Sequence, residues 1–481
     1  MTTTAQVPAP VHARHRPPAV LTALVLVVLS YGLPQTMTVP AMTVIQHDLR
    51  ADPASASWAV LSSTLLASAV CTPLAGRLAD RYGTRRVLLG SLALYLAGTL
   101  GAIVAPDIGA LIAARAVQGI SLALLPLSFA IVRRTLPPDR VAFGLALTAG
   151  LVGTTAGAGL LVGGVLVDHF SWRWLFVVGA VLVLAALAAA IAFVPPLPGT
   201  PGGRLDVPGA LTLATGLVAV LLGITQGPSW GWGSPAVLGL FAGGLAVLAA
   251  FVVIERRTAH PVIDIGLLVH RPLLIAHLGA FALGANQFVF YALLPKLAQL
   301  PAGPGEIGFG ATVTGAALML LPGTLLTLPA SWAVPRIERR FGHRVPLWIG
   351  LGLAACGGVL LAVLHGSLWQ VLACYLVCST GYGFAMAALP TLVNAGSTPE
   401  HSGSANGVNT VARTVGGAAG SQIGAAILAG TVLPGTTTPT SAGFASAFLA
   451  AAVMTGLGVL LLPLLARAKF GRAVPGAVPG R

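Results

Sequence analysis

Two arginines, Arg115 and Arg413, lie inside long apolar segments of this 481-residue chain. A charged side chain at the centre of a membrane costs about 2.5–3.5 kcal/mol on insertion scales, so each arginine is a candidate functional group. A guanidinium stays protonated near neutral pH, but it can hold an anionic or neutral polar group or lower the pKa of a nearby acid. For Arg413, a bracing role in which the side chain ties helix ends together is an equal alternative.

The twelve carboxylates all fall in loops or at the ends of apolar segments. A carboxylate embedded in a membrane can both bind organic cations and carry a proton. This sequence has none at mid-segment, so if protons cross the apolar segments, the candidates left to carry them are Asp48, Asp80, Asp107 and Asp168. The same pattern predicts that any ligand bound within these segments is neutral or weakly ionised rather than a permanent cation.

Uncharged polar residues inside the apolar segments could line a cavity between helices. Gln287 and Tyr291 share a helix face by their spacing of four residues. The alternative for any single residue is a polar contact between packed helices. As a set they predict a polar but mostly neutral cavity, and its members, together with Arg413, are Gln35, Thr36, Gln118, Asn286, Gln287, Tyr291, Tyr382 and Asn409.

No residue pattern indicates an enzyme, a metal site or a cofactor. The ten histidines are scattered, and none pairs with an acid at ligand spacing. Cys374 and Cys378 share a helix face without a His or carboxylate beside them, which favours packing over a metal. The sequence contains no Gly-x-x-x-x-Gly-Lys loop, so transport driven by ATP hydrolysis in this chain is excluded.

The segments that position these residues predict an all-α integral membrane protein. With 56% hydrophobic and 8% charged residues, the chain has more apolar surface than a water-soluble core can hide. Apolar runs of roughly 20 residues each match the thickness of a bilayer. We expect fourteen transmembrane helices, at 19–46, 58–76, 87–106, 108–132, 142–167, 174–194, 208–226, 236–254, 272–295, 309–334, 346–364, 368–393, 405–431 and 441–466.

The net charge of +14 is distributed by loop, which indicates topology rather than nucleic-acid binding. Arginines concentrate in alternate connections and in both tails, whereas the opposite connections carry only Arg50, Arg173 and Lys296. The positive-inside rule then places both termini, the tails 1–18 and 467–481, in the cytoplasm.

The connection after the second predicted helix reads GRLADRYGTRR, from Gly76 to Arg86. It resembles the signature of the major facilitator superfamily, through Gly76, Asp80, Arg81, Gly83 and Arg85. Glycines allow close approach and a tight turn, and an aspartate among arginines can lock neighbouring helix ends. The resemblance implies that this loop gates transport.

A degraded copy of the same loop, RIERRFGHR, follows the tenth predicted helix. Two six-helix halves would repeat after six helices, but these loops lie eight apart, so two helices are inserted. We therefore expect an N-terminal half at 19–194, an inserted pair within 195–271, at 208–226 and 236–254, and a C-terminal half at 272–466. Such repeats are typical of transporters whose substrate binds between the halves.

Further motifs resemble the fourteen-helix drug:proton antiporter branch of that superfamily. LIAARAVQG in the fourth helix carries Leu111, Arg115, Gln118 and Gly119, and SWRWLF begins at Ser171. This likeness implies that Arg115 and Gln118 take part in proton coupling. In the fifth helix, Gly157, Gly159, Gly163 and Gly164 resemble an antiporter motif, with Leu160 in place of its proline. The motif is associated with export, although a seam of small residues for packing would look the same.

Together these features predict a secondary transporter that exports antibiotic-like small molecules across the cytoplasmic membrane by proton antiport. Its partners would be the substrate, protons and lipid, without nucleic acid, and we expect a monomer. An importer or proton symporter of the same fold is the first alternative, because fold alone does not set direction. A membrane enzyme is the second.

Overall fold

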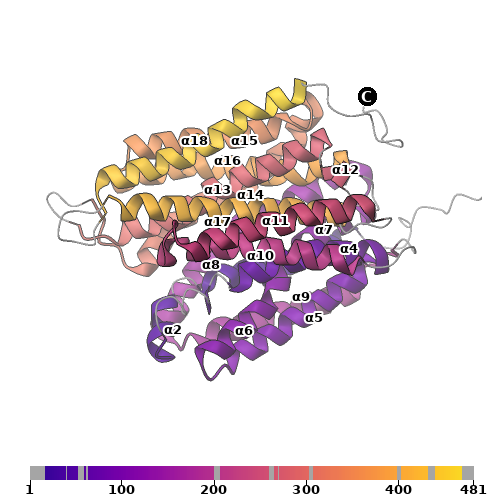
Figure 1. The fold of residues 1–481 in the computed structure, drawn as a ribbon, viewed down its shortest axis with the longest axis horizontal. Coiled ribbons are helices and arrows are strands. Elements are labelled where there is room, and N and C mark those ends of the chain that lie inside the picture. The colour runs from indigo at the N-terminus through magenta and orange to yellow at the C-terminus, as the bar shows by residue number, and fades with distance from the viewer. Residues whose placement is uncertain are drawn as a thin grey trace, which may run out of the picture.

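The computed structural model describes residues 17–38, 41–51, 59–60, 63–199, 206–258, 265–268, 270–302, 307–397, 402–431 and 439–467. Its long elements are all helices that run roughly along one direction (Figure 1). They are α1 (Pro17–Met37), α2 (Met42–Asp48), α4 (Ser63–Tyr82), α5 (Thr84–Ile103), α6 (Ile108–Gln118), η3 (Gly119–Ala123), α7 (Leu124–Thr135), α8 (Pro138–His169), α9 (Arg173–Phe193), α10 (Val207–Trp230), α11 (Pro235–Arg257), α12 (Ile265–Leu268), α13 (Arg271–Gln299), α14 (Val313–Phe341), α15 (Val345–Val363), α16 (Leu368–Gly396), α17 (Ser402–Ala429) and α18 (Ser441–Arg467).

Within the described residues, eleven helical segments are long and apolar enough to cross a membrane. α4, α10 and α17 are also at least 20 residues long and occupy three further predicted spans. A helix of 20 residues covers about 30 Å, which is the thickness of a hydrocarbon core. The prediction of a multi-pass, all-helical membrane protein is confirmed.

Two predicted spans differ from the structure. The span 19–46 divides into α1, which ends at Met37, and α2, which begins at Met42. Pro40 in the interval lacks an N–H group and restricts the residue before it, so a continuous helix is disfavoured there. The span 108–132 contains the tighter turn η3, where a Cβ on Gly119 would stand 2.8 Å from the carbonyl oxygen of Thr64 in α4.

At the starts of several helices, the sequence either removes or pairs the backbone N–H groups that have no partner within the helix. Such groups must be paired within the protein where no water is present. Proline stands in the first turn of α8, α10, α11, α13 and α15. Side-chain caps accept from a backbone N–H at the start of five helices, through Asp107, Asp206, Ser234, Thr312 and Ser367.

The chain forms two groups of helices, and a further pair, α10 and α11, contacts both groups. Figure 1 shows α1 to α9 in indigo and purple on one side and α13 to α18 in orange and yellow on the other. The groups meet chiefly where α8 packs on α14 and α4 packs on α17, with a further contact between α16 and α8. α10 and α11 pair with each other, and α10 also contacts both α4 and α17, so the predicted inserted helices bridge the junction.

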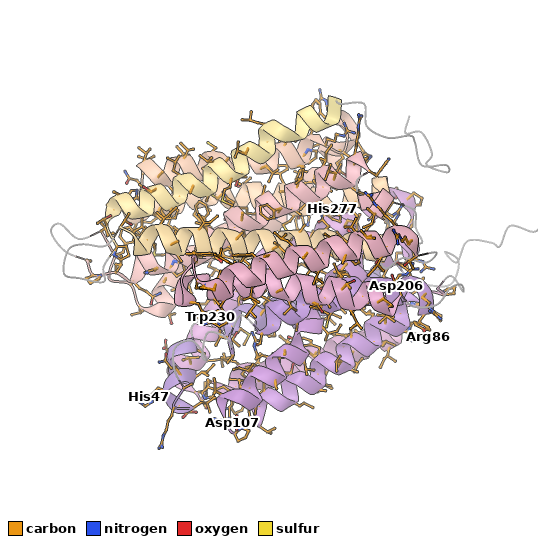
Figure 2. All side chains as sticks on the ribbon, viewed as in Figure 1. His47, Arg86, Asp107, Asp206, Trp230 and His277 are labelled. Carbon is orange, nitrogen blue, oxygen red and sulfur yellow. The ribbon has the colours of Figure 1, made fainter. Side chains whose placement is uncertain are left out.

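The bundle has two ends, which Figure 2 identifies by labelled residues. Arg86 and Asp206 lie at what we call the inner end, and His47, Asp107 and Trp230 lie at the outer end. The two related loops after α4 and α14 both turn at a glycine with positive φ, Gly83 at 100° and Gly342 at 89°. Only glycine adopts this conformation without strain, which explains the repeated glycine of the two sequence motifs.

Candidate substrate and coupling site

Arg115 is buried, with 4% of the residue exposed, and it connects α6 to the short segment that precedes α4. Its Nε donates to Ala59 O at 3.1 Å, and one Nη donates to Val60 O at 2.5 Å. The guanidinium also donates to Gln118 Oε1 at 2.8 Å and to Thr38 Oγ1 at 3.5 Å. Every acceptor is a neutral oxygen.

Gln118 extends this network towards α5 and α1. It is 2% exposed, and its Nε2 donates to Thr99 Oγ1 at 2.8 Å. Thr99 in turn donates to Tyr95 O at 2.8 Å, and the Tyr95 hydroxyl donates to Ser30 O in α1 at 3.1 Å. The predicted coupling pair therefore lies in a buried hydrogen-bonded chain that joins α6, α5 and α1.

Arg115 has no carboxylate at ion-pair distance among the residues that the structure describes. The ion pairs found there all lie near bundle ends: Arg140 with Asp139, Arg173 with Asp48, and His343 with Glu338. Neutral acceptors suit an arginine that braces packed helices. The role of Arg115 and Gln118 in coupling stays a prediction.

Arg413, half-buried in α17, has a different environment. Its guanidinium makes no hydrogen bond with any described residue, although its charge interacts electrostatically with the hydroxyls of Tyr31 in α1 and Tyr291 in α13. Gly284 in α13 lies against the Arg413 backbone, where a Cβ would stand 2.9 Å from the carbonyl carbon. The arginine therefore lies where α17 packs closely on α13.

The polar residues beside Arg413 include the predicted pair on α13. Gln287 Nε2 donates to the Tyr291 hydroxyl at 3.0 Å, so the two side chains do share a face. The Tyr31 hydroxyl is buried and has no hydrogen-bond partner among the described residues. A small and largely apolar pocket begins one turn farther along α13, lined by Leu294, Ala316, Met319, Leu320, Val371, Leu372 and Tyr375.

Three other predicted cavity residues form contacts between helices. Asn286 and Tyr382 are almost completely buried, and the Tyr382 hydroxyl donates to Asn286 Oδ1 at 2.7 Å. Asn286 Nδ2 donates to Ala451 O in α18 at 3.3 Å, and Asn409 Nδ2 donates to Ala276 O in α13 at 2.9 Å. In this conformation their polar groups hold α13, α16, α17 and α18 together, and a cavity role for them stays a prediction.

Gln35 and Thr36 lie near the outer end of α1, and both are half-buried. Thr36 Oγ1 donates to Leu33 O at 3.3 Å within the helix. Gly159 of α8 packs directly against Thr36 and Leu33. These residues therefore lie beside the contact between α1 and α8.

The glycines of α8 form two contact lines on opposite neighbours. Gly159 and Gly163 face α1, and Gly163 lies so close that a Cβ would stand 2.8 Å from the Met37 Cα. Gly157 and Gly164 face α14, as do Gly150 and Gly153. Each of the four α8 glycines that face α14 lies against a hydroxyl-bearing side chain of α14. We call this line the glycine–hydroxyl seam: Gly150 with Ser331, Gly153 with Thr327, Gly157 with Thr324, and Gly164 with Thr314.

The predicted gating loop lies at the inner end between α4 and α5. Gly76 is buried within α4, and Asp80 and Arg81 are half-buried near its end. Gly83 packs against the backbone of Leu197, and Arg85 Nη donates to Ile191 O at 2.7 Å. The loop is therefore held against the chain that follows α9.

Sequence reasoning missed a link between the two helix groups at the inner end. Arg133 in α7 donates to Ser397 O at 3.0 Å, to Ser397 Oγ at 3.4 Å and to Asn394 Oδ1 at 3.5 Å. Asn394 lies in the last turn of α16, and Ser397 is the residue that follows the helix. We call this contact the inner latch. In the sequence, Arg133 is one of several positive charges in a predicted cytoplasmic loop. Its hydrogen-bond partners lie more than 250 residues away, so no local sequence pattern predicts them.

Two contacts at the outer end also escaped prediction. Asp48 accepts from Trp172 Nε1 at 2.7 Å and from Arg173 at 3.2 Å, and these hydrogen bonds, the indole first, hold the pKa of Asp48 below its ordinary value. Thr314 Oγ1 donates to Asp168 Oδ2 at 2.9 Å, which joins α14 to α8. The pairing of Trp172 with Asp48 fixes α2 to the start of α9.

Known proteins match most of the chain. It is 32% identical over 463 residues to the cephamycin export protein CmcT of Amycolatopsis lactamdurans, covering 93% of both chains. It is 32% identical to the puromycin resistance protein pur8 of Streptomyces alboniger, over 83% of this chain and 79% of the relative. The fold resembles the human organic anion transporter MFSD10, with a TM-score of 0.65 and 17% identity over 93% of this chain and 99% of the other.

The family description named Major Facilitator Superfamily matches residues 24–421. This range extends from α1 to α17 and includes the loop after α4, Arg115, the α8 glycines and Arg413. Both bacterial relatives, each 32% identical, are matched over 79% and 93% of their own length. The chain belongs to the Major Facilitator Superfamily of transporters.

Proposed function

We propose that this protein exports antibiotic-like small molecules across the cell membrane by proton antiport. The proposal includes fourteen transmembrane helices, arranged as two six-helix halves with α10 and α11 inserted, both termini in the cytoplasm, and action as a monomer. Relatives that are named for antibiotic resistance or export support the direction and the substrate class.

The observation that carries the proposal is the junction of the two helix groups. They meet along the glycine–hydroxyl seam between α8 and α14 and where α4 packs on α17. Arg413 of α17 makes no hydrogen bond with any described residue and lies where α17 packs closely on α13. In transporters of repeated build, halves that rock about a central site give alternating access. A close, small-residue contact between helices suits such motion because no long side chain has to be unpacked.

Three sets of residues have roles in the proposed cycle. The loop with Gly76, Asp80, Arg81, Gly83 and Arg85 would lock and release the inner end. Arg115 and Gln118 would take part in proton coupling. The cavity would comprise Arg413 and the neutral polar residues Gln35, Thr36, Asn286, Gln287, Tyr291, Tyr382 and Asn409.

Accumulation assays in a drug-sensitive bacterial host test the direction of transport. Cells that express the protein should hold less puromycin than cells without it, and a protonophore should remove the difference. Asp80→Asn, inserted in the membrane to the same level, provides the control for expression alone. Higher internal puromycin in the expressing cells would instead support an importer, and an export that persists with the protonophore would refute proton antiport.

A further inference from the structure

Among the described histidines, His277 alone lies inside a membrane-spanning helix and away from the ends of that helix. It is buried, with 8% of the residue exposed, about two turns into α13. Figure 2 shows it within the second helix group, nearer to the inner end. The described carboxylates lie at or beside helix ends. Because an imidazole changes charge between about pH 5 and 8, His277 is the described side chain of the buried interior that can take up and release a proton near neutral pH.

A contact with Asn409 of α17 fixes which form of the ring the structure holds. Asn409 Nδ2 donates to Ala276 O at 2.9 Å, and a carbonyl oxygen can only accept, so the amide nitrogen points to α13. The same nitrogen lies 3.4 Å from His277 Nδ1. Since Nδ1 faces a donor, it must present its lone pair. This contact between α13 and α17 therefore holds the neutral ring, with Nδ1 unprotonated.

A proton on Nδ1 would turn this contact into one between two donors. An imidazolium carries an N–H on both ring nitrogens and has no acceptor. If the amide of Asn409 turned its oxygen to the ring, it would lose the hydrogen bond to Ala276 O and would set two acceptors against each other. A buried charged donor without an acceptor is costly, so protonation of His277 disfavours this packing of α13 on α17.

The helices packed on α13 give that imidazolium no ion-pair partner among the described residues. In the inner half of α14, Glu338 pairs with His343 at 3.8 Å, and the other charged residues are arginines. α16 has no titratable residue in its inner half, and neither α12 nor the described side chains of α18 include one. The remaining charged or titratable groups at this level are His270 and Arg271 at the start of α13, Arg344 before α15, and Arg413 of α17.

The contact of His277 with Asn409 lies about one turn from the inner latch on α17. Asn394 accepts from Arg133 in the latch at 3.5 Å, and it also accepts from Asn406 Nδ2 of α17 at 3.0 Å. Asn406 precedes Asn409 by three residues, so the two share a face of α17. The position of α17 at Asn409 is therefore linked to the position of the latch residue Asn394.

α13 also contacts the end of α16 that carries the latch. A Cβ on Gly396, the last residue of α16, would stand 3.1 Å from Leu273 Cγ and 3.1 Å from Pro272 Cβ. His277 follows Leu273 by four residues and lies one turn farther along the same face of α13. A separation of α13 from α17 at His277 would therefore disturb both helices that support the end of α16.

We propose that His277 carries the proton of the transport cycle, neutral while the inner latch is closed and protonated when α13 and α17 loosen and the inner end opens. Nδ1 takes the proton from hydronium once the Asn409 contact opens, and returns it to water when the contact forms again. The inference rests on the proposed proton antiport and supplies a titrating group, which neither Arg115 nor Gln118 can be. Its direction suits an exporter, because proton binding favours the form that receives substrate from the cytoplasm.

The separation of the two helix groups at the inner end tests the inference in the full-length protein without substrate. Arg140→Cys in α8 and Arg339→Cys in α14, both exposed positions, carry spin labels in a protein whose native cysteines are replaced by alanine. Pulsed electron resonance in lipid nanodiscs measures the distance between the labels. From about pH 8 to about pH 5.5 the ratio of long to short distances should rise at least about fivefold, the lower end of usual coupling between two sites.

Three variants of this labelled protein separate proton binding from packing. His277→Gln should keep the short distance at both pH values, since its oxygen can accept from Asn409 but does not titrate. His365→Gln is the matched control, because His365 is also buried but contacts Leu361 O and Ser441 Oγ at the outer end, and it should respond to pH like the parent. Asn409→Ala should raise the share of long distances already at about pH 8.

Size-exclusion chromatography confirms that each variant is folded. An unchanged pH dependence in His277→Gln, a parent protein whose distances do not change with pH, or a parent-like ratio in Asn409→Ala would overturn the inference.

The distance measurement and the export assay fail separately. If the distances depend on His277 but a protonophore leaves export unchanged, the protonation of His277 stands and the proposed antiport does not. If His277→Gln exports puromycin in a protonophore-sensitive way like the wild type, the antiport stands and His277 is not its proton carrier.

Discussion

Replacing Gly157 by Ala tests whether the glycine–hydroxyl seam controls how the two helix groups meet. A Cβ at this position would overlap the hydroxyl of Thr324 and would stand 2.7 Å from its Cβ and 2.8 Å from its Cγ2. Ordinary contacts of a Cβ begin at 3.4 Å. α8 and α14 would therefore have to separate by about 1 Å, in an interior whose packing leaves no such space.

The expected cost follows from two opposing terms. Overpacking of this kind costs about 1–3 kcal/mol. Alanine in place of glycine stabilises a helix by roughly 0.5–1 kcal/mol through its higher helix propensity. The net loss is then about 0–2.5 kcal/mol. At its middle value of about 1.3 kcal/mol the population of this arrangement should fall by about tenfold, because about 1.4 kcal/mol is a tenfold change in an equilibrium constant.

Gly243→Ala is the matched control, because it lies in α11 with nothing within 4 Å of its added Cβ. Gly157→Ala should lower the unfolding midpoint in detergent and the initial rate of efflux from loaded cells, whereas Gly243→Ala should change neither. Adding Thr324→Gly to Gly157→Ala removes the clashing side chain and should restore part of both. If Gly157→Ala behaves like Gly243→Ala, the seam does not determine the contact between the helix groups.

The bundle ends and the buried network give further predictions. A cysteine at Gly233, in the exposed turn between α10 and α11, should react with an impermeant maleimide on intact cells, and one at Arg140 should not; the reverse pattern would disprove the orientation. Asp80→Asn should reach the membrane but lose most efflux, since the inner loop must lock and release, and wild-type efflux would contradict this role. Arg115→Lys should also reach the membrane yet lose proton-driven efflux, because lysine cannot reproduce the four hydrogen bonds; a joint fall of protein amount and activity would indicate bracing alone. Asp48→Asn should lower the unfolding midpoint near neutral pH and have no effect well below about pH 4, because a lowered folded-state pKa gives stability that is lost as pH falls through it. A pH-independent difference would show that the charge is not involved.

The helices and the family could be predicted because their signals are local. Apolar length determines that a segment spans a bilayer, and the spacing of Gly76, Asp80 and Gly83 is contained in one loop. The positive φ of Gly83 and Gly342 shows why this glycine persists in both copies of the loop. Pro40 could have predicted the break after Met37. We did not predict the break because the apolar run is long enough for one continuous helix.

The partners of the polar residues could not be predicted, because each comes from a distant part of the chain. Asn286 and Gln287 are neighbours in sequence, yet Asn286 bonds with Tyr382 between packed helices and Gln287 turns to Tyr291 beside Arg413. Likewise Arg115 and Arg413 are the same residue type in similar apolar runs. Their difference depends on whether backbone carbonyls from another segment reach the guanidinium.

The contacts at the two ends of the junction are side-chain hydrogen bonds. The inner latch consists of hydrogen bonds of 3.0–3.5 Å from Arg133, and the outer contact is the single bond of Thr314 to Asp168, which is exposed. A hydrogen bond with a charged partner contributes about 1.5–3 kcal/mol net, so either end could open at a cost that substrate binding can offset. In the glycine–hydroxyl seam between these ends, short hydroxyl-bearing side chains of α14 lie against the glycines of α8. On the proposed cycle the seam would therefore act as the pivot, and a substrate that contacts both helix groups at once would bias which end opens.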